Sequence, residues 1–139
     1  MDDGSPQLYF YNMDRELIFK EEWYTIIGMA MKVHSYLGSG FKEIVYKDAL
    51  EVEFLNNGIP YVRERIFGVQ YFDRILKSRF ECDFLVFDNI IVEVKAKRDF
   101  HSEHFDQTLN YLKAAKVNLG LVLNFGKKSL EYRRVICTE

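Results

Sequence analysis

A glutamate and a lysine interrupt the most apolar stretch of the chain. The run from Ile90 to Lys95 is otherwise made of Ile and Val, yet it contains Glu93 and Lys95 two positions apart. Side chains alternate across a β-strand, so a strand here places this carboxylate and this ammonium on one face. An ion pair without a function would cost desolvation energy in such an apolar strand. The pattern therefore favours a chemical role, with a solvated ion pair as the structural alternative.

A second carboxylate precedes this pair at hairpin distance. Asp83 lies ten residues before Glu93, and Asp88-Asn89 between them is typical of a two-residue turn. An antiparallel register across that turn predicts the two carboxylates about 5 to 8 Å apart on neighbouring strands. Such a pair repels unless a cation lies between its members, and Mg²⁺ and Mn²⁺ bind one or two carboxylates together with water and phosphate. We therefore expect a site for Mg²⁺ or Mn²⁺ at Asp83 and Glu93.

The elements that must position these residues follow from the periodicity of the chain. Apolar residues recur at helical spacing in three segments, and β-branched and aromatic residues dominate five others. The resulting order is ααβββαββ, in which one β-α-β crossover makes two strands of a mixed sheet parallel. Residues 1–20 show no sustained period and indicate an irregular arm, so residues 21–139 form the single domain. The predicted helices cover 21–37, 41–57 and 102–115, and the strands cover 61–72, 80–87, 90–96, 119–125 and 130–136.

Composition narrows the class of protein. The 139 residues are 48% hydrophobic and 16% aromatic, which is typical of one folded domain. Apolar runs stay far below the roughly 20 residues of a membrane-spanning helix, and no signal peptide is recognisable. We therefore expect a cytoplasmic protein that does not interact with membranes. Residues 1–94 contain 10 Lys and Arg against 16 Asp and Glu, whereas residues 95–139 contain 9 against 5. The basic second half is compatible with a polyanionic partner.

Two other residue types are predicted to take no part in the chemistry. His34, His101 and His104 lack the spacing of metal ligands, so surface or helix-capping roles are expected for them. Cys82 precedes Asp83 in the strand, and simple alternation places it on the opposite face of the sheet as a buried, inert thiol.

The segment Asp83 with Glu93-Val94-Lys95 resembles the core of the PD-(D/E)XK nuclease superfamily. A more specific resemblance is in the second helix, where Gly40 to Tyr46 matches the pattern G-x-x-E-x-x-Y of the GxxExxY family of small bacterial proteins. Gly58-Ile59-Pro60, the helical motif Gln107 to Lys113 and the closing segment Gly120 to Gly126 are similar to further parts of that family. Cys82 stands where the superfamily name has a proline.

This resemblance implies a fold and a set of site residues. The fold would be of the restriction-endonuclease-like α/β type, a mixed β-sheet flanked by helices. Asp83 and Glu93 would bind the metal, together with the backbone carbonyl of Val94 and with Glu43 directly or through water. Lys95 would position the attacking water or stabilise the transition state, and Gln107 and Tyr111 would orient the lysine, the water or a phosphate. Without the resemblance, Glu43 would be an acid favoured in the first turn of a helix, and Tyr46 and Tyr111 would be packing residues.

The resulting functional hypothesis is metal-dependent hydrolysis of phosphodiester bonds in nucleic acid, with DNA favoured over RNA. The metal would lower the pKa of a bound water and neutralise charge on the phosphate. A catalytically silent nucleic-acid-binding or protein-interaction module on the same fold is the alternative. Because the chain is small and only modestly basic, we expect a homodimer or a partner protein to complete the binding surface.

Overall fold

The computed structural model describes residues 19–99 and 102–137, which form three helices and five strands in the predicted order ααβββαββ. The predicted arm at residues 1–20 lies almost wholly outside these residues, as does His101. The elements are α2 (Lys20–Leu37), α3 (Glu43–Asn56), β1 (Tyr61–Tyr71), β2 (Arg74–Val86), β3 (Ile90–Lys95), α4 (Glu103–Ala115), β4 (Leu119–Asn124) and β5 (Glu131–Ile136).

The five strands form one mixed sheet in the order β1-β2-β3-β4-β5. Strands β3 and β4 are parallel because α4 connects them, and every other neighbouring pair is antiparallel. Strand β4 is buried along its whole length and β3 along nearly all of it, as expected for central strands covered on both faces. The predicted mixed α/β architecture is therefore confirmed.

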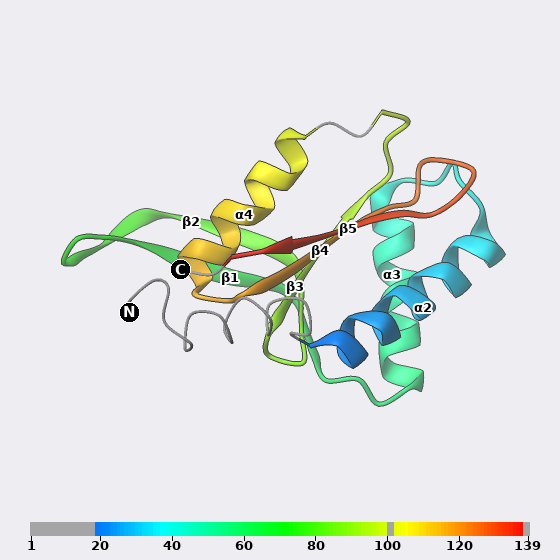
Figure 1. Cartoon of the computed structure of the whole chain (residues 1–139), viewed down its shortest axis with the longest axis horizontal. Coiled ribbons are helices and arrows are strands. Elements are labelled where there is room, and N and C mark those ends of the chain that lie inside the picture. Colours follow the sequence, from blue (N-terminus) through cyan, green and yellow to red (C-terminus); the bar gives the residue numbers. More distant parts are fainter. Residues whose placement is uncertain (1–18, 100–101, 138–139) are drawn as a thin grey trace, which may run out of the picture.

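Helices cover both faces of the sheet (Figure 1). The larger hydrophobic cluster contains Ile26 and Ala30 of α2, Leu50 and Phe54 of α3, and strand residues such as Val92. A smaller cluster on the α4 side is built around Cys82, Leu85, Ile91 and Leu112. The residues of β3 thus divide between the two clusters by alternation, and Glu93 has the same parity as Ile91 on the α4 side.

The helical spacing of Phe105, Leu109 and Leu112 predicts that these residues form the core face of α4, and the structure differs from this prediction in part. Leu112 is fully buried as predicted, but the other fully buried residue of α4 is Thr108. Phe105 is only half-buried, and the guanidinium of Arg133 lies over its ring at 4.7 Å. The difference arises because β5 contacts the start of this helix with a basic rather than an apolar side chain.

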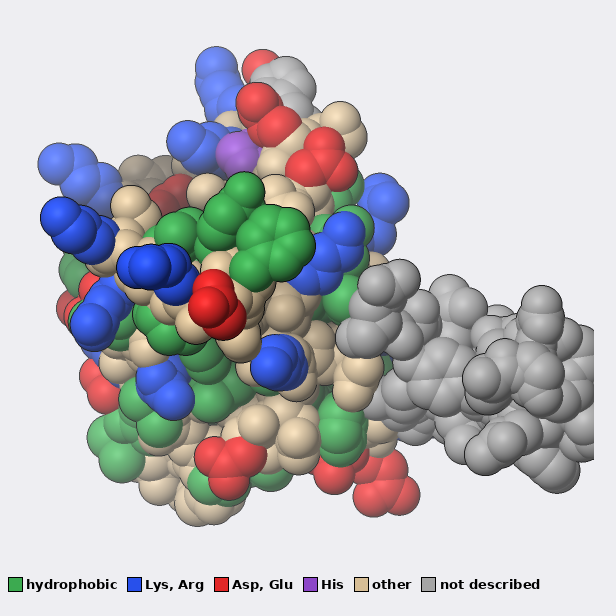
Figure 2. All heavy atoms as spheres, turned by 90° about the vertical axis from the view of Figure 1, so that its left-hand side faces the viewer, with side chains coloured by type: hydrophobic (Ala, Val, Ile, Leu, Met, Phe, Trp, Pro, Cys, Tyr) green, Lys and Arg blue, Asp and Glu red, His purple; other side chains and the backbone are tan. Residues whose placement is uncertain are grey.

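Strands β1 and β2 form a hairpin that is longer than predicted. Strand β2 begins at Arg74 rather than at residue 80, and its first six residues are all exposed. No core lies beneath this part, so the sequence lacks the alternation that would have identified it. The hairpin extends beyond the sheet on the left of Figure 1, and Figure 2 looks onto that end of the molecule.

The turn between β2 and β3 contains three residues rather than two. The last pair of the ladder is Val86 with Ile90, so Phe87, Asp88 and Asn89 form the connection. Phe87 and Asp88 both have positive φ, and the Asn89 N–H donates to the Val86 carbonyl at 3.1 Å. Phe84 pairs with Val92, and one residue further along the same register sets Asp83 opposite Glu93.

None of the described helices is both long and apolar enough to span a membrane.

Candidate active site

The two predicted acidic residues meet where β2 and β3 stop pairing through their backbones. The Asp83 N–H donates to Oε2 of Glu93 at 2.9 Å, and the Val94 N–H donates to Oδ2 of Asp83 at 2.7 Å. Each carboxylate thus replaces a ladder bond of the neighbouring strand. The side chains are held against one another with almost no freedom of rotation, which is the preorganisation that a metal or catalytic site requires.

Burial and charge act together on Glu93. The residue is only 4% exposed. Desolvation is the main cause that raises the pKa of Glu93, to about 8, and the neighbouring Asp83 carboxylate raises it further. Hydrogen bonding from the Asp83 N–H and the charges of Lys95 and Lys47 act in the opposite direction. A buried carboxyl group with a strongly raised pKa beside a second carboxylate is typical of a functional site.

Lys47 of α3 is a member of this site that sequence reasoning missed. Its Nζ lies 3.1 Å from Oδ1 of Asp83 and 3.0 Å from Oε2 of Glu64. Burial by itself lowers the pKa of Lys47, but the hydrogen bond to Glu64 and the charge of Asp83 outweigh it and raise the pKa. The one signal in the sequence is that Lys47 follows Glu43 by one helical turn, and its role depends on how α3 packs on the sheet.

Glu64 of strand β1 is the second carboxylate that pairs with Lys47. Its φ of 56° lies in the left-handed region, which is uncommon for a residue with a Cβ atom. The hydrogen bond from Lys47 is the main cause that lowers the pKa of Glu64. Two carboxylates, from β1 and β2, therefore neutralise one largely buried ammonium group.

The side chains of β2 do not alternate regularly around Asp83. Cys82 packs with Leu85 and Ile91 in the α4-side cluster, whereas Phe84 packs in the larger cluster on the other face. Alternation is therefore interrupted at Asp83, opposite the left-handed Glu64. Cys82 is a buried free thiol as predicted, and burial is the main cause that raises its pKa to about 12.

Three further predicted residues line one cleft beside the acidic pair. Glu43, Lys95 and Gln107 come from α3, β3 and α4, and together with Lys97, Glu103 and His104 they surround a volume of about 330 Å³. Glu43 accepts a hydrogen bond from the Ala96 N–H at 3.3 Å, just past the end of β3. The cleft thus opens at the carboxyl end of the strand that carries Glu93 and Lys95.

Tyr111 adjoins the pair from the α4 side. Its ring stacks on Phe80 of β2 at 4.2 Å between centroids. Desolvation is the main cause that raises the pKa of the Tyr111 hydroxyl, and the charges of Glu93 and Asp83 raise it further. On α4, Gln107 thus lines the cleft, and Tyr111, one turn later, packs on β2.

Tyr46, the tyrosine of the G-x-x-E-x-x-Y pattern, is a structural residue. It is fully buried and stacks on Phe125 at 4.6 Å. Its hydroxyl donates to the Gly38 carbonyl and accepts from the Phe41 N–H, so it ties down the loop between α2 and α3. This loop leads into α3, so the tyrosine helps to position Glu43, the first residue of that helix.

His34 is buried, so the surface role predicted for it is wrong. Its Nε2 lies 2.8 Å from the Lys127 carbonyl and holds the loop between β4 and β5.

Asn124 is a further residue near the site that sequence reasoning missed. Its buried side chain accepts from the Lys97 N–H and donates to the Lys97 carbonyl, both at 2.9 Å, and so fixes the segment after Lys95.

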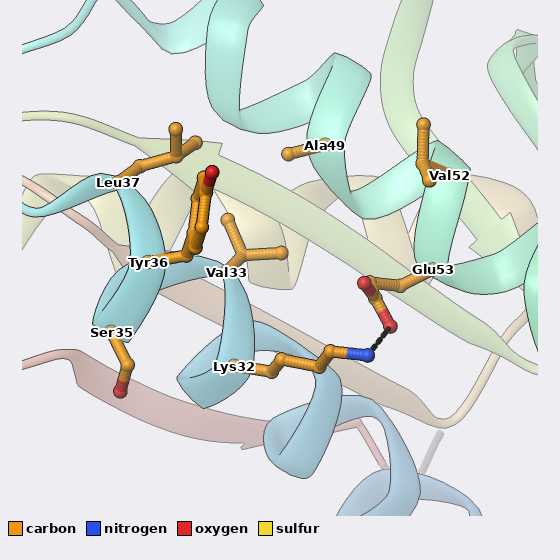
Figure 3. A pocket seen from close by; sticks show the side chains of 8 residues that line it. All are labelled: Lys32, Val33, Ser35, Tyr36, Leu37, Ala49, Val52 and Glu53. Atoms are coloured by element: carbon orange, nitrogen blue, oxygen red, sulfur yellow. Dashed lines mark ion pairs between the residues drawn. The ribbon is translucent and has the colours of Figure 1, made fainter.

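A larger hollow, of about 620 Å³, lies between α2 and α3 (Figure 3). Its lining is mostly apolar, with one ion pair of 3.3 Å between Lys32 and Glu53. None of the predicted site residues lines it. Size alone therefore does not mark the chemical site, which is the smaller polar cleft.

The donor atoms of the acidic pair suit a hard divalent cation. Asp83, Glu93 and the Val94 carbonyl supply oxygen only, which Mg²⁺ and Mn²⁺ prefer. Within residues 19–99 and 102–137, no three His, Cys, Asp or Glu side chains are close enough together to hold a metal. Asp83 and Glu93 therefore fit such an ion only if backbone oxygen and water complete its coordination. Lys47 would compete with the ion for Asp83.

Sequence comparison agrees with this geometry. The sequence model of the PD-(D/E)XK nuclease superfamily matches residues 20–135. The chain belongs to this superfamily. The matched part of this PD-(D/E)XK protein includes the acidic pair, Lys95 and the whole sheet. Among curated proteins, no sequence matches the chain significantly.

A solved structure has a similar fold. The crystal structure of SSO0001 is similar with a TM-score of 0.55 and 16% sequence identity. The alignment covers 88% of this chain and 60% of the SSO0001 chain, so the PD-(D/E)XK domain described here spans less than two thirds of that chain. The likeness shows the restriction-endonuclease-like fold.

Proposed function

We propose that this chain is a metal-dependent nuclease of the GxxExxY family that hydrolyses phosphodiester bonds. The observation that carries the proposal is the reciprocal clamp between Asp83 and Glu93, in which each side chain bonds the backbone of the other strand at 2.7 to 2.9 Å. Nothing in the folding of a hairpin requires two acids to replace its ladder bonds. The membership of the superfamily, whose name describes nucleases, supports the same function.

Mg²⁺ or Mn²⁺ would be held by Asp83, Glu93 and the Val94 carbonyl, with Glu43 through water. When bound, such an ion supplies Lewis acidity and lowers the pKa of a bound water. Lys95 projects into the cleft beside Glu93, where it would orient the attacking water and contact the phosphate. Gln107 faces the same cleft and would hold a phosphate oxygen or the Lys95 ammonium. Tyr111 closes the opposite side and excludes water from the acidic pair.

The reaction is ordinary hydrolysis. The oxygen of water bonds to phosphorus, the bond from phosphorus to one ester oxygen breaks, and that oxygen takes a proton. The chemistry needs no oxidant or further cofactor. We expect nucleic acid as the substrate, DNA in preference to RNA, and a homodimer or partner protein that extends the surface around the small cleft.

One observation favours the alternative of a catalytically silent binding module. Lys47 already neutralises Asp83 at 3.1 Å, so the site is electrically compensated without a metal. A silent module would keep the fold and this ion pair but would show no turnover with any divalent cation.

Glu93→Gln separates the two functions. We expect the purified wild-type protein to cleave a mixed panel of single- and double-stranded oligonucleotides with Mn²⁺, and the variant to be slower by about two orders of magnitude or more. Binding measured in Ca²⁺, which supports binding without cleavage in many nucleases, should stay within a fewfold of wild type. Glu81→Gln, an exposed acid on the same strand, is the matched control. Wild-type protein that binds but never cleaves across Mg²⁺, Mn²⁺ and all substrates would establish the silent module instead.

A further inference from the structure

The outer half of the β1–β2 hairpin has no partner in the described structure. Its residues are almost all exposed, and the apolar side chains at its tip are among the most exposed of the chain. Phe72 is 82% exposed, and Tyr71 and Ile75 are at least 60% exposed. Water-exposed aromatic side chains at the end of a projecting ribbon are typical of a binding surface.

This part of the hairpin is also basic. Residues 65–82 contain four basic side chains, Arg65, Arg74, Lys77 and Arg79, against two acids, Asp73 and Glu81. None of Arg74, Lys77 and Arg79 forms an ion pair with any residue of the described ranges. In the space-filling view of this end, Lys and Arg side chains surround an apolar patch (Figure 2). Cations without acidic partners beside exposed rings suit an anionic ligand with flat, stackable groups.

The hairpin is continuous with the candidate active site. At its base, Phe67 of β1 stacks on Phe80 of β2 at 5.3 Å, and Phe80 stacks on Tyr111 at 4.2 Å. The guanidinium of Arg65 lies over the Phe67 ring at 4.5 Å. Strand β2 then leads directly from Arg74 to Asp83, a distance of up to about 30 Å at the usual rise per residue. A strand of nucleic acid in the cleft would therefore pass along this ribbon.

From these observations we infer that the outer β1–β2 hairpin is a nucleic-acid-binding arm that holds a single-stranded part of the substrate next to the site of cleavage. The inference rests on the proposed function for the cleavage step, but it concerns a surface outside the acidic site. Arg74, Lys77 and Arg79 contact phosphates, and Phe72 stacks on an unpaired base. Nucleic acid is favoured over a protein partner because the excess of basic side chains on this hairpin is neutralised best by a polyanion.

Fluorescence anisotropy with labelled oligonucleotides in Ca²⁺ tests the arm independently of turnover. The triple variant Arg74→Gln, Lys77→Gln, Arg79→Gln should bind a single strand at least tenfold more weakly. The slope of log Kd against log salt should fall by about two, since each lost phosphate contact on a single strand removes roughly 0.7. Lys20→Gln, Lys32→Gln, Lys128→Gln removes three exposed lysines outside the hairpin and should change neither quantity appreciably.

Phe72→Ala tests the stacking. We expect about tenfold weaker binding to a single strand and a much smaller change for a blunt duplex. Arg74→Lys with Arg79→Lys should retain most of the affinity, which guards against a loss caused by misfolding. Unchanged affinity and salt slope in the triple variant would overturn the arm while leaving Glu93-dependent cleavage intact. A wild-type protein that binds no nucleic acid, or a Phe72→Ala variant that alters only the sedimentation of the protein, would also overturn it.

Discussion

The ammonium group of Lys47 lies next to the acidic pair, at the position where a divalent cation would bind Asp83. The lysine bridges Asp83 and Glu64, and its side chain is only 11% exposed. Two ions close together in a poorly solvated site compete for the same negative charge. A stronger ion pair between Lys47 and Asp83 therefore lowers the affinity of the site for a metal ion.

Removing the ammonium should strengthen metal binding. We expect Lys47→Met to bind Mn²⁺ about tenfold more tightly than wild type, or about 1.4 kcal/mol, by titration calorimetry or by the electron paramagnetic resonance signal of free Mn²⁺. Lys32→Met, which breaks the 3.3 Å pair with Glu53 on the other side of α3, is the matched control and should leave the affinity unchanged. Weaker Mn²⁺ binding by Lys47→Met would mean that the lysine orients Asp83 rather than opposing the metal.

The raised pKa of Glu93 predicts how the metal-free protein responds to pH. Burial favours the neutral carboxyl group in the folded state, with a pKa of about 8, against 4.5 for an ordinary glutamate. The unfolded chain thus loses this proton first as the pH rises, and the stability that protonation contributes is lost between pH 4.5 and 8. The acids whose pKa is lowered, such as Glu51, act in the opposite sense but are already ionised above pH 5.

Thermal unfolding in EDTA from pH 5 to 9 measures this effect. We expect the melting temperature of the wild-type protein to fall by several degrees across this range. Glu93→Gln keeps a neutral side chain at every pH, so its melting temperature should fall less and should exceed that of wild type at pH 8. A variant that is less stable than wild type at pH 8 would show that Glu93 serves as a structural ion.

At the residue scale, the sequence was informative where chemistry depends on local spacing. The proximity of Asp83 and Glu93 was predicted from their ten-residue separation across a tight hairpin, although the turn contains three residues and not the two expected. Lys47 and Glu64 could not be found in this way, because their meeting depends on how α3 packs on β1 and β2. The burial of Cys82 was predicted, but the irregular alternation of β2 at Asp83 was not.

At the scale of elements, the segment between β3 and α4 is held by the end of β4. Asn124 bonds both backbone groups of Lys97. Gly126 lies against the same residue, and a Cβ atom on it would be 2.6 Å from the Lys97 carbonyl carbon. Only glycine permits this close approach, so the Asn-Phe-Gly sequence fixes the chain that follows Lys95.

Gly126→Ala should therefore be strongly destabilising. The added methyl group meets backbone rather than a flexible side chain, so we expect a loss of about 2 to 3 kcal/mol in the free energy of unfolding, measured by urea denaturation. Gly28→Ala is the control, because a Cβ atom there meets nothing within 4 Å on the exposed side of α2. That change should stabilise the protein by up to about 1 kcal/mol. Equal effects of the two substitutions would contradict this account of Gly126.

The helices and strands themselves were largely predictable. The bounds of all three helices and of the buried strands agree with the periodicity to within two residues, because each of these elements has an apolar face on the core. The first six residues of β2, Arg74 to Arg79, were missed for the complementary reason. They are all exposed, so no alternation marks them in the sequence.

At the scale of the whole molecule, the site receives residues from helices on both faces of the sheet. Glu43 and Lys47 reach it from α3, Gln107 from α4 on the other face, and Glu93 and Lys95 from the central strand between them. No single element contains enough of the set to act alone. The cleft is small, and in the proposed function the basic hairpin would supply the further length of surface that a nucleic-acid strand requires.

A crystal structure of the protein with Mn²⁺, with an anomalous difference map that locates manganese, would show directly whether Asp83 and Glu93 bind a metal. We expect one strong peak between the carboxylates of Asp83 and Glu93, within about 2.2 Å of an oxygen of each, with the Lys47 ammonium moved away from Oδ1 of Asp83. The same soak of Glu93→Gln should lose the peak. Wild-type crystals at millimolar Mn²⁺ that show no manganese there, with Lys47 still 3.1 Å from Asp83, would contradict the assignment of this site as a metal-dependent nuclease centre.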